Sequence, residues 1–552
     1  MDLAFPMEGS LDLRHPTPGG SMTHDSPTHV LAIDLGTSGP KTALVSPSGN
    51  VADWEFEPTP VALQPDGGAE QAPGDWWRAV TAATRRMMAR GAVPPDRVAA
   101  LSVTTQWSGT VAVDRHGDPL TNAIIWMDSR GAEDVRRLVG GGPRIAGYGA
   151  GKLIPWVRLT GGVPTLSGKD PIAHILFLKR TRPDVFRNAH KFLEPKDFLN
   201  LRLTGLFAAS WDSIALHWVT DNRDIGRIRY SERLLRMAGI SREQLPDLRR
   251  AVDILGPLRP APAKELGLPP GIPVITGTPD IHSAAVGSGA VEDYRAHLYL
   301  GTSSWLTCHV PFKKTDLLHN MASLPSALPG KYFVANEQET AGGCLTFLLD
   351  LLADPETAGR KRPRGSEAYA GLERIAGRAP AGSGGVIFTP WLYGERTPVE
   401  EHTLRGGFHN LSLETRREHL VRAVFEGVAY NGRWLLRYVE RFVRRRFDTI
   451  HMVGGGSRSD LWCRIHADVL GRRIHQVRDP LLANARGAGL LGAVGLGLLR
   501  VEDIPSRVEI AASYEPDPNR RRTYDRMFRE YINLYRGTRS VYARMNRTGR
   551  RI

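Results

Sequence analysis

An aspartate, a glycine and a threonine stand together directly after a short apolar run near the start of the sequence. Residues 30–33 are Val-Leu-Ala-Ile, and Asp34-Leu-Gly-Thr-Ser38 follows. A carboxylate at a strand tip can hold Mg²⁺, while Gly36 allows close backbone approach and Thr37 offers a hydroxyl to anionic oxygen. The tetrapeptide Leu-Gly-Thr-Ser recurs at residues 300–303. Two such turns on opposite walls would grip a polyphosphate.

A third glycine turn, Gly454-Gly-Gly-Ser457, connects an apolar run at 449–453 to a helical pattern at 460–470. The N–H groups and the dipole at a helix start attract negative charge or the polar edge of a nucleotide. A tight strand-to-helix connection that needs positive φ explains the same glycines without any ligand. The pattern by itself leaves both interpretations open.

Asp280 is the candidate for proton transfer. It follows the strand-like residues 271–276 within Gly277-Thr-Pro-Asp-Ile-His-Ser. A carboxylate in such a place could accept the proton of an alcohol that attacks a γ-phosphate. It could equally cap a helix that begins at Ile281, because Asp is a favoured capping residue.

The elements that must position these groups alternate between strand and helix patterns. A hairpin is predicted over 29–45, strands at 98–104 and 110–114, and a helix over 74–88. This alternation predicts an α/β fold. The chain of 552 residues is long enough for two large domains. We expect a loose leader at 1–28, one domain over 29–276 and a second over 277–552.

The net charge of +14 is concentrated at the C-terminal end, where eleven Arg face Asp525 and Glu530 beyond residue 519. Apolar and aromatic residues recur there at helical spacing (Tyr524, Met527, Phe528, Tyr531, Tyr535), which predicts an amphipathic helix packed on a core. A tail helix packed in this way argues against a nucleic-acid partner. The three widely spaced cysteines predict neither disulfides nor a zinc site, and no segment predicts a membrane span. We expect a cytoplasmic protein, with a homodimer as a candidate assembly.

The order of these segments resembles the FGGY family of carbohydrate kinases across nearly the whole chain. The matching segments are Asp34 to Lys41, Gln106 to Asp114, Ala123 to Arg130, Phe186 to Gly205, Gly277 to Gly289, Leu300 to Ser303, and the glycine motifs at 454 and 487. The resemblance implies an α/β fold with two actin-like, ribonuclease-H-like domains flanking a deep cleft. It also implies ATP and Mg²⁺ as cosubstrates and transfer of a phosphoryl group to a sugar or polyol hydroxyl.

The resemblance assigns roles by motif position. Asp34 would serve the metal and Asp280 would be the catalytic base. The groups expected to bind ATP are Gly36, Thr37, Ser38, Lys41, Gly301, Thr302, Ser303, Gly454, Gly455, Gly456, Ser457 and Asn484. The sugar site would comprise Gln106, Trp107, Ser108, Trp126, Asp128 and Asp280. A core Trp126 and a strand-end Asp128 remain the alternative for those two residues.

The sequence departs from the family pattern at positions that bear on the substrate. Xylulokinase-like members have Met-His after the glutamine of the first-domain sugar motif, whereas Trp107-Ser108 stand here. Ile281 and His282 follow the expected base in place of Asn or Gln, and Asn410 occupies a position where Gly is expected. We predict an ATP-dependent kinase of a ketose. A polyol kinase, such as a glycerol kinase, and an actin-like ATPase or scaffold are the alternatives.

Overall fold

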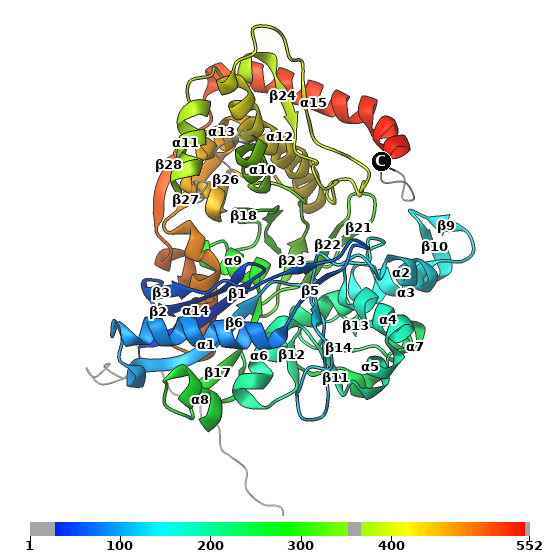
Figure 1. Ribbon diagram of the computed structural model, residues 1–552, viewed down its shortest axis with the longest axis vertical. Helices are drawn as coiled ribbons and strands as arrows, with labels where there is room; N and C mark the ends of the chain where they lie inside the picture. The colour runs from blue at the N-terminus through cyan, green and yellow to red at the C-terminus, as the bar shows by residue number, and fades with distance from the viewer. Residues whose placement is uncertain (1–27, 352–365, 547–552) are drawn as a thin grey trace, which may run out of the picture.

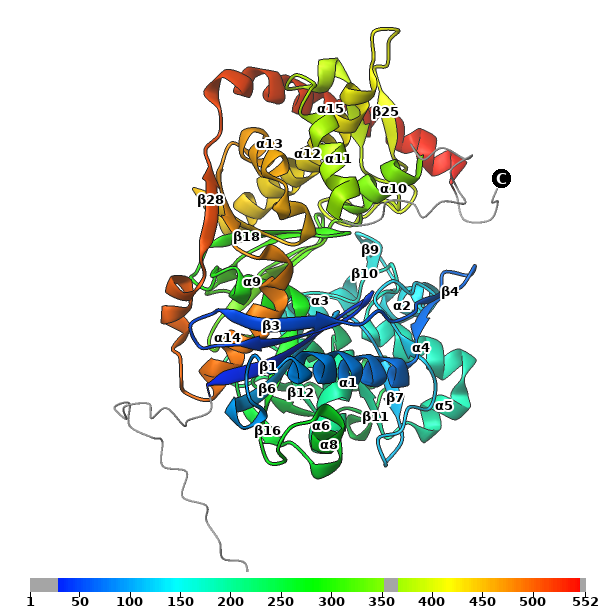
Figure 2. The same ribbon diagram turned by 60° about the vertical axis from the view of Figure 1, so that its left-hand side comes forward.

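The computed structural model describes residues 28–351 and 366–546 of the chain. Two lobes lie one above the other in Figures 1 and 2, each built around its own main sheet. The predicted leader at 1–28 lies outside the described residues apart from Thr28. Within the described ranges, every helix is too short or too polar to cross a bilayer.

The first lobe contains a six-stranded sheet in the order β16-β17-β6-β1-β2-β3. Its strands are β1 (His29–Gly36), β2 (Gly39–Val45), β3 (Val51–Phe56), β6 (Val98–Thr105), β16 (Ile254–Pro257) and β17 (Pro273–Pro279). β1, β6 and β17 run parallel, and the flanking β2 and β16 are antiparallel to their neighbours. The three parallel strands are buried along almost their whole length because both faces of the sheet are covered there, with α1 (Pro73–Ala89) on one face.

The second lobe contains a five-stranded sheet in the order β19-β18-β26-β27-β28. Its strands are β18 (Ala296–Leu300), β19 (Ser304–Thr307), β26 (Thr449–Val453), β27 (Arg473–Val477) and β28 (Ile510–Tyr514). β18, β26 and β27 are parallel, with an antiparallel strand at either edge. This arrangement repeats that of β2-β1-β6-β17-β16. The two Leu-Gly-Thr-Ser tetrapeptides therefore occupy equivalent hairpins, β1–β2 and β18–β19.

The helices that follow the third parallel strand of each sheet cross between the lobes. α9 (Asp280–Gly287) follows β17, and α14 (Ala483–Gly495) follows β27. α14 packs on the first sheet, where Ala485 and Ala488 join Ala32 and Ala43 in one apolar cluster. α9 instead joins a cluster with residues of the second lobe, including Trp305 and Val453. Small side chains let the two helices approach closely, so this crossing connects the lobes behind the cleft.

A second connection lies on another side of the cleft. The sheet β20-β23-β22-β21, which falls within residues 309–335, leans on the first lobe. Thr315 Oγ1 donates to the Gly161 carbonyl at 2.6 Å, and the Tyr332 hydroxyl donates to the Asn222 carbonyl at 2.9 Å. Leu324 is buried among residues of the first lobe, including Trp156. The lobes are thus held together at two separate places.

Several sequence predictions are confirmed by these elements. The hairpin at 29–45 is β1–β2, the strand at 98–104 is β6, and the helix at 460–470 is α13 (Asp460–Leu470). The tail forms α15 (Pro518–Met545), which buries the five predicted residues and exposes most of its arginines. The predicted domain boundary after residue 276 falls inside β17.

Candidate active site

The parallel strands bring the candidate residues of the first lobe to one edge of its sheet. β1, β6 and β17 end at Gly36, Thr105 and Pro279, so the residues that follow them lie side by side. These are the first Gly-Thr-Ser turn, the loop Gln106–Ser108 and Asp280. In the second lobe β18, β26 and β27 deliver the second Gly-Thr-Ser turn, the Gly454 turn and the start of α14 in the same way.

A cleft cavity of about 350 Å³ collects groups from both edges. The predicted site residues that line it are Asp34, Gly36, Thr37, Ser38, Lys41, Gln106, Trp107, Ser108, Trp126, Asp280, Thr302, Ser303 and Asn484. Asp128, Gly301 and Gly454 to Ser457 do not line this cavity. Both turns that carry the repeated tetrapeptide therefore contribute to one cleft.

The acidic centre of the cleft is formed by Asp34 and Asp280. Asp34 is 1% exposed, its Oδ2 lies 3.4 Å from the Lys41 ammonium, and its Oδ1 has no hydrogen-bond partner among the described residues. Asp280 opens α9, and its Oδ1 accepts the Ile281 backbone N–H at 2.8 Å. Burial, and next the negative charge of Asp34, raise the pKa of Asp280 to about 8. An acid with such a pKa can exchange a proton near neutral pH.

Thr37 joins the first turn to the predicted sugar loop, Gln106–Ser108. Its hydroxyl donates to Gln106 Oε1 at 3.0 Å and accepts from the Trp126 indole N–H at 2.9 Å. The Gln106 amide donates in turn to Gln71 Oε1 at 2.8 Å, and Gln71 Nε2 donates to the Thr37 carbonyl at 3.0 Å. These bonds fix the turn and the indole together, so Trp126 presents its ring to the cleft with its donor already used.

The two unusual residues of the sugar loop are also held by backbone partners. The Trp107 indole N–H donates to the Ser213 carbonyl at 3.0 Å, and its ring meets the His282 ring edge-on at 5.4 Å. Ser108 has a φ of +68° and donates to the Lys169 carbonyl at 2.7 Å. The departures at 107 and at 282 are therefore in contact with each other, which the sequence did not indicate.

Asp128 lies behind the cleft wall. It is 1% exposed and accepts hydrogen bonds from the backbone N–H groups of Ala69 and Arg130, both at 2.9 Å. The Arg130 guanidinium also donates to it at 2.6 and 2.9 Å. These contacts use both carboxylate oxygens, as in the strand-end alternative considered from the sequence.

The glycine turns of the second lobe support one another. Gly454 has a φ of +91°, and a Cβ at that position would lie 2.7 Å from the Leu300 carbonyl oxygen. The Ser457 hydroxyl donates to the Gly454 carbonyl at 2.7 Å, which closes the third turn on itself. The Gly301 carbonyl accepts a hydrogen bond from the Gly342 N–H at 2.7 Å, and Gly342 was not among the predicted site residues. The third turn thus lies against the strand end from which the second one begins.

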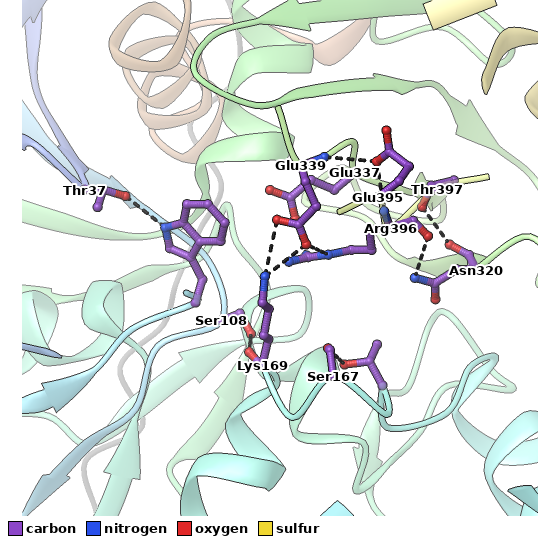
Figure 3. Close-up of polar contacts among 12 residues, drawn as sticks. Thr37, Ser108, Ser167, Lys169, Asn320, Glu337, Glu339, Glu395, Arg396 and Thr397 are labelled. Atoms are coloured by element: carbon purple, nitrogen blue, oxygen red, sulfur yellow. Dashed lines mark hydrogen bonds and ion pairs between the residues drawn. The ribbon is translucent and has the colours of Figure 1, made fainter. Parts of the chain in front are cut away.

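Four charged residues that sequence reasoning missed form a cluster at one wall of the cleft (Figure 3), and three of them, Lys169, Glu337 and Arg396, line the cavity. The Lys169 ammonium, from the first lobe, donates to both carboxylate oxygens of Glu339 in the second lobe, at 3.0 and 3.3 Å. Arg396 donates to Glu339 at 3.1 Å and also pairs with Glu337. Glu337 and Glu339 follow β23 (Tyr332–Ala335). Acidic residues directly after an apolar strand could have marked them as candidate site residues from the sequence. No local pattern marks Lys169 or Arg396.

The backbone conformation at Asn410 explains why this residue can stand where glycine is expected. Its φ is +64°, a left-handed conformation that Gly adopts freely and that Asn tolerates better than most residues. Its side chain donates to the Gly385 carbonyl at 3.1 Å. The backbone geometry is therefore kept despite the substitution.

Comparison with known proteins identifies relatives along almost the entire chain. Residues 29–287 match the N-terminal domain model of the FGGY family of carbohydrate kinases, and residues 296–496 match its C-terminal domain model. Xylulose kinases from Bacillus subtilis and Escherichia coli are 26% and 28% identical over 93% and 91% of this chain, and 98% and 99% of their own. The fold is shared with a gluconate kinase from Lactobacillus acidophilus, with a TM-score of 0.81 at 22% identity, over 94% of this chain and 99% of that one.

Proposed function

The chain belongs to the FGGY family of carbohydrate kinases, and we propose that the hydroxyl it phosphorylates is that of an uncharged ketose, D-xylulose foremost. ATP is the phosphoryl donor of this family. Both curated relatives described above are xylulose kinases and align over nearly their full length. The family identity favours a sugar kinase over the actin-like scaffold considered from the sequence.

One observation carries the assignment of the active site. Asp34, Asp280 and both Gly-Thr-Ser turns line a single cavity between two lobes. A phosphoryl donor gripped by the two turns would place its terminal group beside Asp280. An ATPase without an acceptor would not require such an aspartate at that place.

The residues present fit a divalent cation. Asp34 offers a buried carboxylate oxygen that has no partner within the described residues, and carboxylate oxygens are the ligands that Mg²⁺ prefers. Mg²⁺ bound there would neutralise charge on the phosphates. Thr37, Thr302 and Ser303 would bind the phosphates, and Gly454, Gly455, Gly456 and Asn484 the adenosine. Trp126 would cover an apolar face of the sugar beside Gln106, Trp107 and Ser108, and Asp128 would act from behind the wall by holding Arg130.

The mechanism that fits this arrangement is direct in-line transfer. The Asp280 carboxylate accepts the proton of the acceptor hydroxyl. As it does so, the hydroxyl oxygen forms a bond to the γ-phosphorus, and the bond between the γ-phosphorus and the ADP oxygen breaks. The two lobes exclude water, which would otherwise compete as the acceptor. Lys41, beside Asp34, balances negative charge in the first turn.

The test is ADP release by the purified protein with MgATP and a panel of ketoses, aldoses, polyols and sugar acids. We expect the highest kcat/KM with D-xylulose and a phosphorylated sugar as the product. ADP release that no compound of the panel stimulates would refute the proposal. The cytoplasmic location, the homodimer and the lack of a nucleic-acid partner stay predictions of the sequence.

A further inference from the structure

The charged wall of the cleft contains a donor that its protein partners leave unused. The Nε and Nη1 atoms of Arg396 bind Glu339 and Glu337, whereas Nη2 is buried and has no hydrogen-bond partner among the described residues. Arg396 lines the cavity together with Lys169, Glu337 and Asp280. A buried N–H group without an acceptor destabilises the fold, so an acceptor in the cavity would recover stability.

The backbone around Arg396 is fixed by several contacts. Glu395 Oε1 accepts the backbone N–H groups of Arg396 and Glu339, at 2.8 and 3.1 Å, which ties the two segments together. The Asn320 amide donates to the Arg396 carbonyl at 3.3 Å. The guanidinium is therefore oriented before any ligand arrives, as a group that selects a ligand must be.

The charges of this wall cancel. Lys169 and Arg396 supply two cations, and Glu337 and Glu339 supply two carboxylates (Figure 3). Burial raises the pKa of the Glu339 carboxyl, but the positive charges of Arg396 and Lys169 outweigh it and hold that pKa below its ordinary value. Asp170 and Glu395 lie close by and add carboxyl groups but no cation. An anionic ligand would thus meet no excess positive charge to offset its desolvation.

We propose that Arg396 is a specificity-determining residue of the second lobe, which donates from Nη2 to an uncharged oxygen of the sugar, and that Glu337 and Glu339 exclude sugar acids by neutralising its charge. Lys169 is a positioning residue that acts through Glu339 and joins the first lobe to this contact. The inference rests on the proposed sugar kinase activity and adds the chemical class of the acceptor. It also places part of the sugar site in the lobe opposite the predicted sugar loop.

Steady-state kinetics with a neutral sugar and the aldonate of the same chain length test the inference. Arg396→Lys keeps the charge but loses the fixed fork, and we expect it to raise the KM for the neutral sugar about 10- to 100-fold, with the KM for ATP changed less than about twofold. Arg405→Gln is the matched control, because Arg405 is exposed on the same segment and, within the described residues, its hydrogen bonds go to backbone carbonyls. An unchanged sugar KM in Arg396→Lys overturns the contact.

Glu337→Gln tests the charge argument without touching Arg396. It removes one of the two carboxylates that offset Lys169 and Arg396, and we expect the ratio of kcat/KM for the aldonate to that for the neutral sugar to rise about tenfold. An unchanged ratio overturns the inference, as does a wild-type enzyme that prefers the aldonate. Because Glu337→Gln keeps the size of the side chain and Arg396 retains its ion pair with Glu339, this variant also decides the question if Arg396→Lys fails to fold. A wild-type enzyme inactive on both compounds counts against the proposed function itself.

Discussion

Gly287 of α9 and Gly487 of α14 face each other's helices at equivalent positions. A Cβ on Gly287 would lie 1.8 Å from the Ala483 carbonyl oxygen, and a Cβ on Gly487 would lie 1.9 Å from the Ser283 carbonyl oxygen. Each close contact joins a glycine to the residue four positions before the other glycine. The helix crossing that connects the lobes therefore requires glycine at both positions.

Gly487→Ala tests this crossing. The added methyl would force α9 and α14 apart, and overpacking of this kind typically costs about 1–3 kcal/mol. We expect a lower melting temperature by thermal unfolding and a lower kcat, because the lobes would meet at a different distance. Gly432→Ala in α12 (Arg417–Val443) is the control, since its Cβ would have 3.9 Å to the nearest atom. Equal stability of both variants would contradict the close crossing.

Asp280→Asn separates catalysis from folding. Loss of a general base typically lowers kcat about 10²- to 10⁴-fold. The melting temperature should not fall, because Asn has no charge to bury. Glu426 is the contrast. It is buried in α12 outside the cavity and accepts hydrogen bonds from Gly382, Ser383, Arg422 and Tyr524. Glu426→Gln should therefore lower the melting temperature, whereas Asp280→Asn should not. Wild-type turnover in Asp280→Asn would remove Asp280 from the mechanism.

The pH profile follows from the pKa of Asp280. A base works only when ionised, so kcat should rise with pH through about 8 when the charge of Asp34 is uncompensated. A divalent cation at Asp34 would offset the charge that raises this pKa, so a higher Mg²⁺ concentration should move the rising limb to lower pH. Stopped-time assays across pH at two Mg²⁺ concentrations measure the shift. A limb that moves upward, or does not move, argues against a metal at Asp34.

Gly36→Ala probes the first phosphate turn. A Cβ there would lie 3.7 Å from its nearest protein neighbour, the Gly39 carbonyl oxygen, so the protein itself has room for it. Any effect must then come from the ligand that approaches the turn. We expect a KM for ATP raised about tenfold at an unchanged melting temperature. Gly151→Ala is the control, because its Cβ would meet no atom within 4 Å. Equal ATP kinetics in both variants would show that the phosphates bind elsewhere.

Much of the fold could be predicted because the local signals were strong. The pattern at 29–45 marked a hairpin, the repeated tetrapeptide marked a second turn of the same kind, and the spacing of Tyr524, Met527, Phe528, Tyr531 and Tyr535 marked the buried face of α15. These features depend on residues close together in the chain, where backbone geometry alone sets which side chains share a face. The pairing of those hairpins with equivalent sheets needed the strand order, which sequence spacing does not contain.

The candidate site was harder to predict where its members meet through space. Lys169 meets Glu339 from the other lobe, and Trp107, which follows β6, meets His282 of α9, which follows the neighbouring strand β17. Asp128, for which the sequence left both a sugar contact and a strand-end role open, forms an ion pair with Arg130 and does not line the cavity. Whether a polar side chain faces ligand or protein depends on its neighbours in space, and local sequence does not name them.

By itself the sequence determined which groups are candidates for the chemistry, because an aspartate at a strand end, a glycine turn and a paired tetrapeptide are local patterns. Only the tertiary structure decided which of these groups share a cavity, that Asp280 has a raised pKa, and that two cations and two carboxylates balance along one wall. The physical reason is that burial and electrostatic interaction depend on distances between groups, and those distances are set when the lobes pack together.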